Sequence, residues 1–262
     1  MEILGFILVG TCVGTFGTLI GLGGGLILVP LFMFTMLAPN GTTFDTVQQV
    51  IGTSLFAVTC NAVSGAYAYL RQRRIMFRAA IPFALATIPG AFTGSLVSQY
   101  FTGAGFSVAF GTLLAVLGCF MYWKSNSKRA TASAEGFDPA TAKFNLPLGI
   151  ALTFCVGFIS TIFGIGGGII DVPMMVFILG FPAQIAVASS TFILMVSSLV
   201  GTISHGMLGH IVLLPAVCIG AGCVLGAQIG ARLSKRSKPK VLVIILSVTM
   251  VFMGIQLIYR GL

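Results

Sequence analysis

The chain has 262 residues, of which 57% are hydrophobic and 7% are charged, and its formal net charge is +9. A soluble domain carries about 25% charged residues, so this composition excludes an ordinary soluble globular protein. Thirteen of the fourteen basic residues fall in three stretches between apolar segments, a pattern that argues against a nucleic-acid-binding surface and is typical of the cytoplasmic loops of a membrane protein.

The N-terminus carries an acidic Glu2 where a secretory signal would be basic, and no small-residue cleavage pattern follows. We therefore expect the first apolar segment to be part of the fold. The six cysteines lie in apolar stretches without C-x-x-C spacing, so we expect inert thiols and neither a metal site nor a cofactor.

Ten apolar segments follow one another along the chain, at about residues 3–20, 25–38, 50–70, 79–99, 104–123, 146–163, 168–180, 185–208, 211–231 and 241–259. Most are long enough for a helix to cross a hydrocarbon core of roughly 30 Å. The second and seventh are shorter, and whether they and their neighbours span or re-enter stays open. The pattern predicts an all-α polytopic membrane protein with about 8–10 transmembrane helices.

The two halves of the chain repeat each other. The stretch "CVGTFGTLIGLGGGLILVP" from Cys12 matches "CVGFISTIFGIGGGIIDVP" from Cys155 at an offset of 143, and the offset then settles at 136, where Gln48 matches Gln184. The polar stretch 124–145 separates them. We therefore predict one membrane domain made of two five-segment repeats, residues 1–123 and 146–262, joined by a cytoplasmic linker.

The basic loops indicate how the repeats are oriented. If loop 71–78 is cytoplasmic, the crossings between the loops place 124–143 and 232–240 on the same side and both termini outside. A basic loop in one half then corresponds to a neutral loop in the other. Because each half has an odd number of segments, the repeats are expected to be inverted across the membrane, as in many secondary transporters.

A run of three glycines stands between the first and second segments of each half. Such a run permits positive φ and lets a helix begin with bare N–H groups and the positive end of its dipole. Two such helix starts from opposite faces would form an anion site near the midplane, although close helix packing would also explain the glycines. The glycines concerned are Gly23, Gly24, Gly25, Gly166, Gly167 and Gly168.

Hydroxyl and amide side chains open the third and eighth segments. The hydroxyls can either cap these helices or bind an anion, and the amides either donate to an oxyanion or lie at the surface. The candidates are Thr53, Ser54, Ser189, Ser190, Thr191, Gln48 and Gln184.

Asp171 is the one acidic residue deep in an apolar segment, where its repeat partner is Leu28. A carboxylate there costs roughly 2.5–3.5 kcal/mol on insertion scales, so it is expected to face a cavity or a partner, and it is a candidate proton carrier. A structural hydrogen bond is the alternative. His205 is a second candidate for proton coupling, or an interfacial histidine, and Asn61 is expected to form a helix–helix hydrogen bond.

The duplicated "GLGGGLILVP" and "GIGGGIIDVP", with "GTS", "ASS" and "GAQIGARLSKR", resemble the TauE/SafE (TSUP) family of sulfite exporters over nearly the whole chain. The resemblance implies a bacterial-type inner-membrane transporter of sulfite, related sulfur oxyanions or organosulfonates, and more weakly implies proton coupling. Asp171 departs from the family, in which this position is commonly apolar, and "ASST" departs from the usual "GTS".

Three classes of function are compatible with a polytopic membrane protein of this kind. An alternating-access transporter of a small anion is favoured, and an anion channel with the same site is the alternative. An intramembrane hydrolase is disfavoured because the chain has no G-x-S-x-G motif and the topology places Asp171 and His205 at opposite ends of their segments. The expected partners are a small anion and the bilayer, not nucleic acid.

Overall fold

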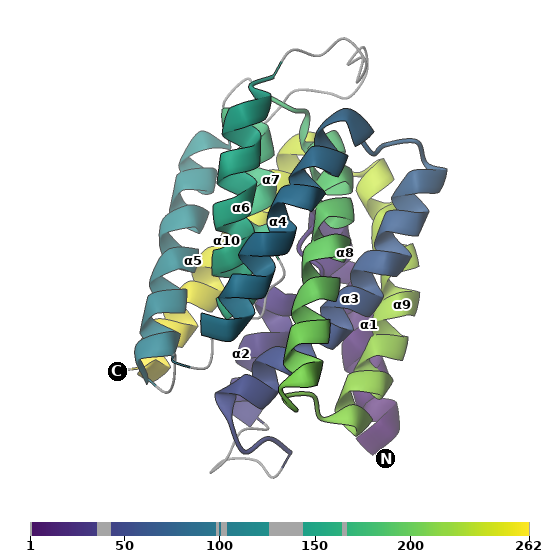
Figure 1. Cartoon of the computed structure of the whole chain (residues 1–262). Coiled ribbons are helices and arrows are strands. Elements are labelled where there is room, and N and C mark those ends of the chain that lie inside the picture. Colours follow the sequence, from purple (N-terminus) through teal and green to yellow (C-terminus); the bar gives the residue numbers. More distant parts are fainter. Residues whose placement is uncertain are drawn as a thin grey trace.

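The computed structural model describes residues 2–35, 43–97, 100, 104–125, 144–163 and 167–261, and these residues are almost entirely helical (Figure 1). The helices of the first half are α1 (Glu2–Ile20), α2 (Gly25–Thr35), α3 (Val47–Arg71), α4 (Phe77–Val97) and α5 (Ala104–Lys124). Those of the second half are α6 (Leu146–Ile162), α7 (Gly168–Pro173), the π-helix η2 (Met174–Ile178), α8 (Ala183–Met207), α9 (Leu213–Arg236) and α10 (Pro239–Gly261).

Six helices in the described part of the chain are long and apolar enough to cross a membrane, namely α1, α3, α4, α8, α9 and α10. In such helices every backbone hydrogen bond is made within the segment, which is the condition for crossing hydrocarbon. This confirms the predicted class of all-α polytopic membrane protein.

The helix ends depart from the apolar segments where polar residues continue a helix. α9 runs to Arg236, although the apolar segment was predicted to end at about residue 231. Hydropathy marks where a helix leaves the hydrocarbon, not where its hydrogen bonding stops. The seventh segment changes to a π-helix at Met174, directly after Pro173, which cannot donate a backbone hydrogen bond. Residues 36–38 of the predicted second segment lie outside the described residues.

Helices of one half pack mainly on helices of the other. α1 lies along α9 and α4 along α6, while α3 contacts both α8 and α9, and α5 lies along α10. Glycines make these approaches close: a β-carbon at Gly226 would clash with the main-chain oxygen of Thr11, and one at Gly90 would clash with that of Phe154. These contacts are related by the offsets found in the sequence, so both halves use the same packing.

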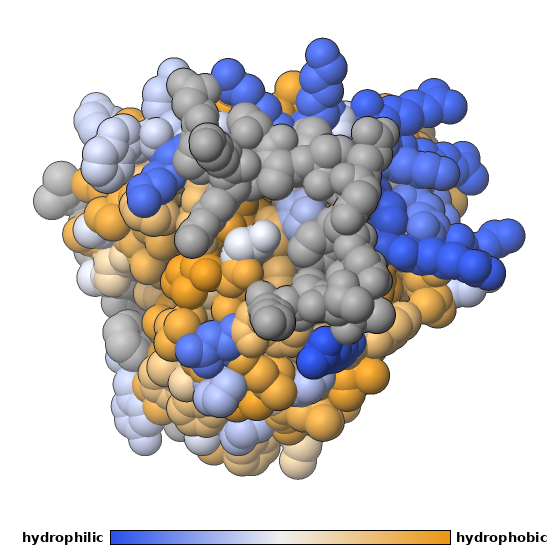
Figure 2. Space-filling view, turned by 90° about the horizontal axis from the view of Figure 1, so that it is seen from above, coloured by the Kyte–Doolittle hydropathy of each residue, from blue (hydrophilic) through white to orange (hydrophobic). Residues whose placement is uncertain are grey.

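The connections α3–α4, η2–α8 and α9–α10 meet at one end of the molecule. The amide of Gln184, at the start of α8, donates to the main-chain oxygen of Ser237 at 2.9 Å, and Arg74 donates to the main-chain oxygen of Gln184 at 3.0 Å. This is the upper end in Figure 1, and both chain termini lie at the lower end. Seen from above, strongly hydrophilic side chains gather at this upper end (Figure 2).

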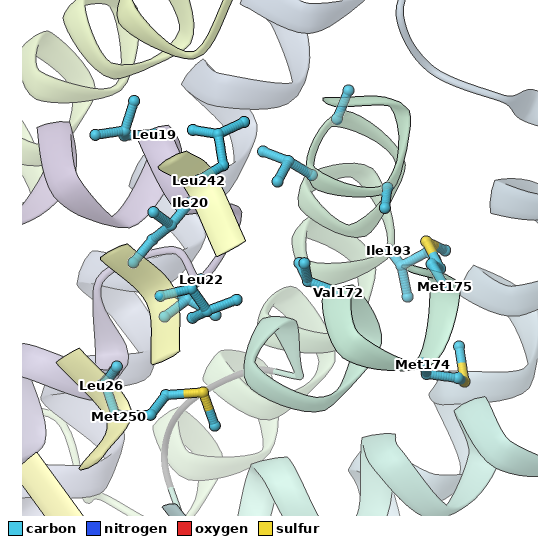
Figure 3. Close-up of a cluster of buried hydrophobic side chains, with 14 of the residues drawn as sticks. Leu19, Ile20, Leu22, Leu26, Val172, Met174, Met175, Ile193, Leu242 and Met250 are labelled. Atoms are coloured by element: carbon cyan, nitrogen blue, oxygen red, sulfur yellow. The ribbon is translucent and has the colours of Figure 1, made fainter. Parts of the chain in front are cut away.

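The segments that follow the two glycine runs lie in one apolar core. Leu22 and Leu26 lie near α10, and Val172 and Met175 lie near α8 (Figure 3). All four side chains are buried. The core therefore holds both turns in fixed positions.

Candidate functional site

The first glycine turn joins α1 to α2 through three residues with positive φ: Gly21 (80°), Gly23 (68°) and Gly24 (92°). The N–H groups of Ile27 and Leu28 both donate to the main-chain oxygen of Gly24, at 3.0 Å. Gly25 and Leu26, the first two residues of α2, come before Ile27 in the chain, so their N–H groups lie at the positive end of the helix dipole.

The described part of the second turn repeats this geometry in the other half. Gly167 has φ 109°, and its main-chain oxygen accepts from Ile170 at 3.1 Å and from Asp171 at 3.2 Å. Gly167 corresponds to Gly24 at the offset of 143. Gly166, which was also predicted to belong to the site, lies outside the described residues.

The two turns touch each other. A β-carbon at Gly168 would clash with the main-chain oxygen of Gly21 and would lie 2.8 Å from the Cα of Leu22. Ser190 of α8 lies at the same place, with its hydroxyl 3.4 Å from the main-chain oxygen of Gly21. The described glycines of both turns are buried. The structure thus brings together the start of α7, the turn between α1 and α2, and one of the predicted hydroxyls.

The hydroxyls of Thr53 and Ser189 have structural partners. Thr53 accepts from the N–H of Val212 at 3.1 Å, and Ser189 accepts from the N–H of Met76 at 3.0 Å. Each hydroxyl thereby holds the last residue before a neighbouring helix, which is α9 for Thr53 and α4 for Ser189. The two hydrogen bonds are equivalent at the offset of 136. Thr191 donates to Val187 within its own helix, and Ser54 is buried beside Thr53.

The two predicted glutamines are not at the turns. Gln184 donates to Ser237 at the upper end of the molecule. Gln48 lies in the first turn of α3, which begins at the lower end, and is half-buried.

Asp171 is fully buried, with 0% of its surface exposed, and neither of its carboxylate oxygens has a hydrogen-bond partner in the described residues. A β-carbon at Gly167 would lie 3.2 Å from Asp171 Oδ2, 3.5 Å from Ser197 Oγ and 3.8 Å from Ser160 Oγ. Three oxygen-bearing side chains from α6, α7 and α8 therefore surround the space beside this glycine.

His205 lies elsewhere, at the lower end of α8. Its Nδ1 is 3.2 Å from the Nδ1 of His210, so one of the two nitrogens donates to the other. Burial lowers the pKa of His210 below its usual value. The equivalent residues at the upper end are Tyr69 and Arg74, whose guanidinium carbon stands 5.4 Å from the centre of the tyrosine ring.

A cavity of about 820 Å³ opens at the upper end between α3 and α9. Four cations and two amides line it together with apolar residues, and its lining includes no acidic residue. The polar lining residues are Arg71, Gln72, Gln228, Arg232, Lys235 and Arg236. Such a surface raises the local concentration of anions.

Sequence reasoning missed Ser160 and Ser197 as members of the Asp171 cluster. The repeat partner of Ser160 is Gly17, so this position changes in polarity between the halves, as Leu28 and Asp171 do, whereas Ser197 corresponds to the polar Asn61. The asymmetry at Ser160 was the available signal. Asn61 forms the predicted helix–helix hydrogen bond, because its Oδ1 accepts from Thr18 at 2.8 Å, while its Nδ2 has no partner in the described residues.

The sequence model of the family "Sulfite exporter TauE/SafE" matches residues 6–257. The probable membrane transporter protein YunE of Bacillus subtilis is 33% identical over 100% of this chain and 99% of its own length. A probable membrane transporter protein of Methanocaldococcus jannaschii is 26% identical over 95% of this chain and 92% of its own. No solved structure gives a significant match.

Proposed function

This chain belongs to the sulfite exporter TauE/SafE family and is a membrane transporter, and we propose that its cargo is a small anion of the sulfur-oxyanion or organosulfonate class. The observation that carries the proposal is the contact between the two glycine turns. The start of α7 lies against the turn that leads from α1 into α2 in a buried place, and the first N–H groups of a helix bind oxyanions without a fixed positive charge.

The proposed site consists of Gly24 and Gly25 of one half, Gly167 and Gly168 of the other, and the Ser190 hydroxyl. Gly23, which the sequence also predicted, already donates its N–H to the main-chain oxygen of Gly17 at 3.2 Å. An anion held there would take its hydrogen bonds from both halves at once. Selectivity would rest on N–H groups, hydroxyls and the size of the space, and this favours a compact oxyanion.

We propose that the protein works by alternating access, with the halves as inverted repeats in a plasma (inner) membrane. The first hairpin, α1–α2, enters from the lower end in Figure 1, and the second, α6–α7, enters from the upper end. Rocking of one half against the other would expose the same site to each side in turn. The upper end, with its basic cavity, is then cytoplasmic, and both termini are outside.

Coupling to protons is part of the proposal, with Asp171 as the carrier at the turn. His205 is the second carrier, although it lies apart from the turns in a pair with His210. A proton bound at Asp171 would offset the charge of the anion as both move together.

The test uses purified protein in liposomes. Radiolabelled sulfite, thiosulfate and a small sulfonate are offered in turn, with sulfate as the larger oxyanion, and with unlabelled anion inside to drive counterflow. A transporter exchanges label for unlabelled anion and accumulates it against its gradient when a proton gradient is imposed. Passive equilibration without uphill accumulation would point to the anion channel, and no flux of any of these anions would overturn the proposed function.

A further inference from the structure

The second glycine turn differs from the first in the buried polar side-chain atoms near it that lack a hydrogen-bond partner in the described residues. In the second turn, the two carboxylate oxygens of Asp171 and the hydroxyl of Ser160 have no hydrogen-bond partner among the residues that the structure describes. At the equivalent positions of the first half stand Leu28 and Gly17. The repeat would be complete without these polar groups, so the fold itself does not require them.

Oxygen atoms of three side chains converge beside Gly167, and one of them, the Ser197 hydroxyl, donates to the main-chain oxygen of Leu194 at 3.3 Å. Asp171 Oδ2, Ser197 Oγ and Ser160 Oγ lie 3.2, 3.5 and 3.8 Å from the point that a β-carbon of Gly167 would occupy. They come from three separate elements, and all three residues are at most 1% exposed. The absence of a side chain at Gly167 leaves space between them.

The end of α6 adds to the negative potential at this place. The helix ends at Ile162, so Ser160 lies in its last turn, at the negative end of the helix dipole. The elements packed against α7 are α6, α8 and η2. Their titratable side chains are Cys155, which is exposed on α6, and His205, which lies two turns beyond Ser197 on α8.

In the first half, the buried polar side-chain atom that lacks a hydrogen-bond partner in the described residues is a donor and not an acceptor. Asn61 corresponds to Ser197, and its Nδ2 is buried without a partner in the described residues. One half therefore offers an N–H donor, which suits an anion, and the other offers carboxylate and hydroxyl oxygens, which suit a hard cation.

We propose that Asp171, Ser160 and Ser197 form a binding site for one small monovalent cation, either a sodium ion or a proton, that is carried with the anion. This inference rests on the proposed function, because an anion at the contact between the turns would be repelled by an unneutralised Asp171. Binding of the cation removes that repulsion, so each ligand strengthens binding of the other.

The test measures uptake of radiolabelled sulfite or thiosulfate into liposomes in sodium, potassium or choline chloride, each at an acidic and an alkaline pH. The thermal stability of the detergent-solubilised protein is followed over the same series. We expect sodium or acid to raise both uptake and stability in the wild type. Asp171→Asn is expected to abolish this dependence, and Ser160→Ala to raise the half-maximal cation concentration by about tenfold, the scale seen when a partner of a metal ligand is removed.

Ser198→Ala is the matched control, since Ser198 is also buried on α8 and, like Ser197, donates within its own helix, but it is not among the three side chains nearest to Gly167. It should keep the wild-type cation dependence. Asp171→Leu, which copies Leu28 of the first half, serves if Asp171→Asn does not fold.

The two proposals fail in different ways. Wild-type liposomes that carry none of the anions would overturn the proposed function. The cation site would be overturned if uptake and stability of the wild type did not depend on sodium or pH. It would also be overturned if such a dependence remained in both Asp171 variants. Neither result would contradict the proposed anion transport.

Discussion

Gly168 lies directly against the main-chain oxygen of Gly21, so the turn of one half leaves no room for a side chain on the turn of the other. The two residues are far apart in the sequence and on opposite halves. Their contact fixes the two turns against each other, so that backbone forms one wall of the proposed anion site beside it.

Gly168→Ala should disturb this contact. The added methyl clashes with backbone, which cannot move aside as a flexible side chain can, and overpacking of this kind costs about 1–3 kcal/mol. We expect a lower melting temperature and loss of anion transport in the protein that still folds. Gly206→Ala is the control, because its new methyl would meet only Ile211 Cδ1 at 3.5 Å; normal transport by Gly168→Ala would rule out the close contact.

Arg73→Gly should stabilise the protein. Arg73 is the one non-glycine residue in the described chain with positive φ, at 55°, and its repeat partner Gly209 has φ 73° in the equivalent turn. An L-residue in this conformation costs roughly 1–2 kcal/mol, and the greater freedom of glycine in the unfolded chain offsets part of the gain. Arg73→Ala removes the same charge but keeps the β-carbon, so a rise in melting temperature in both variants would assign the effect to charge.

Ser189→Ala and Thr53→Val should lower stability without changing the affinity for the anion. Each variant removes the acceptor of a backbone N–H, from Met76 or Val212, and an unsatisfied buried donor costs about 1–3 kcal/mol. Thermal unfolding and the KM of transport are measured together. A raised KM at unchanged stability would instead place these hydroxyls on the substrate.

Arg232→Gln should weaken the attraction of anions to the cavity between α3 and α9. We expect a several-fold rise in KM at low ionic strength, little change in the maximal rate, and a smaller difference at high salt, because screening already removes the effect. Lys238→Gln removes an exposed charge outside the lining and is the control. If the two variants had equal effects, the change in KM would be due to surface charge in general and not to the cavity.

The His205–His210 pair predicts a fall in stability on mild acidification. Burial lowers the pKa of His210 below 6.5, so as pH falls below about 6.5 the unfolded chain takes up protons that the folded chain does not. The free energy of unfolding therefore falls with pH in that window. Full protonation of both rings would also leave no acceptor for the Nδ1–Nδ1 hydrogen bond. His210→Gln should show a smaller loss of melting temperature between neutral and mildly acidic buffer; an equal loss would assign the effect to other groups.

The sequence by itself determined the membrane class, the order of the apolar segments and the two repeat offsets. These are one-dimensional properties, since the length of an apolar run and the register of two glycine runs can be read without knowing what packs where. Asn61 could likewise be predicted to bond across helices, because a buried amide in an apolar segment needs a partner. Helix ends such as Arg236 could not, since charged residues extend a helix beyond the hydrocarbon.

Only the tertiary structure decided which polar groups meet. Thr53 and Ser190 look alike in the sequence, yet one caps the connection before α9 and the other lies at the first glycine turn. Ser160 and Ser197 joined Asp171 only once α6, α7 and α8 were packed around Gly167. The physical reason is that hydrogen bonding and charge compensation depend on distances of a few ångströms between helices remote in sequence. Hydropathy and spacing along one chain do not specify those distances.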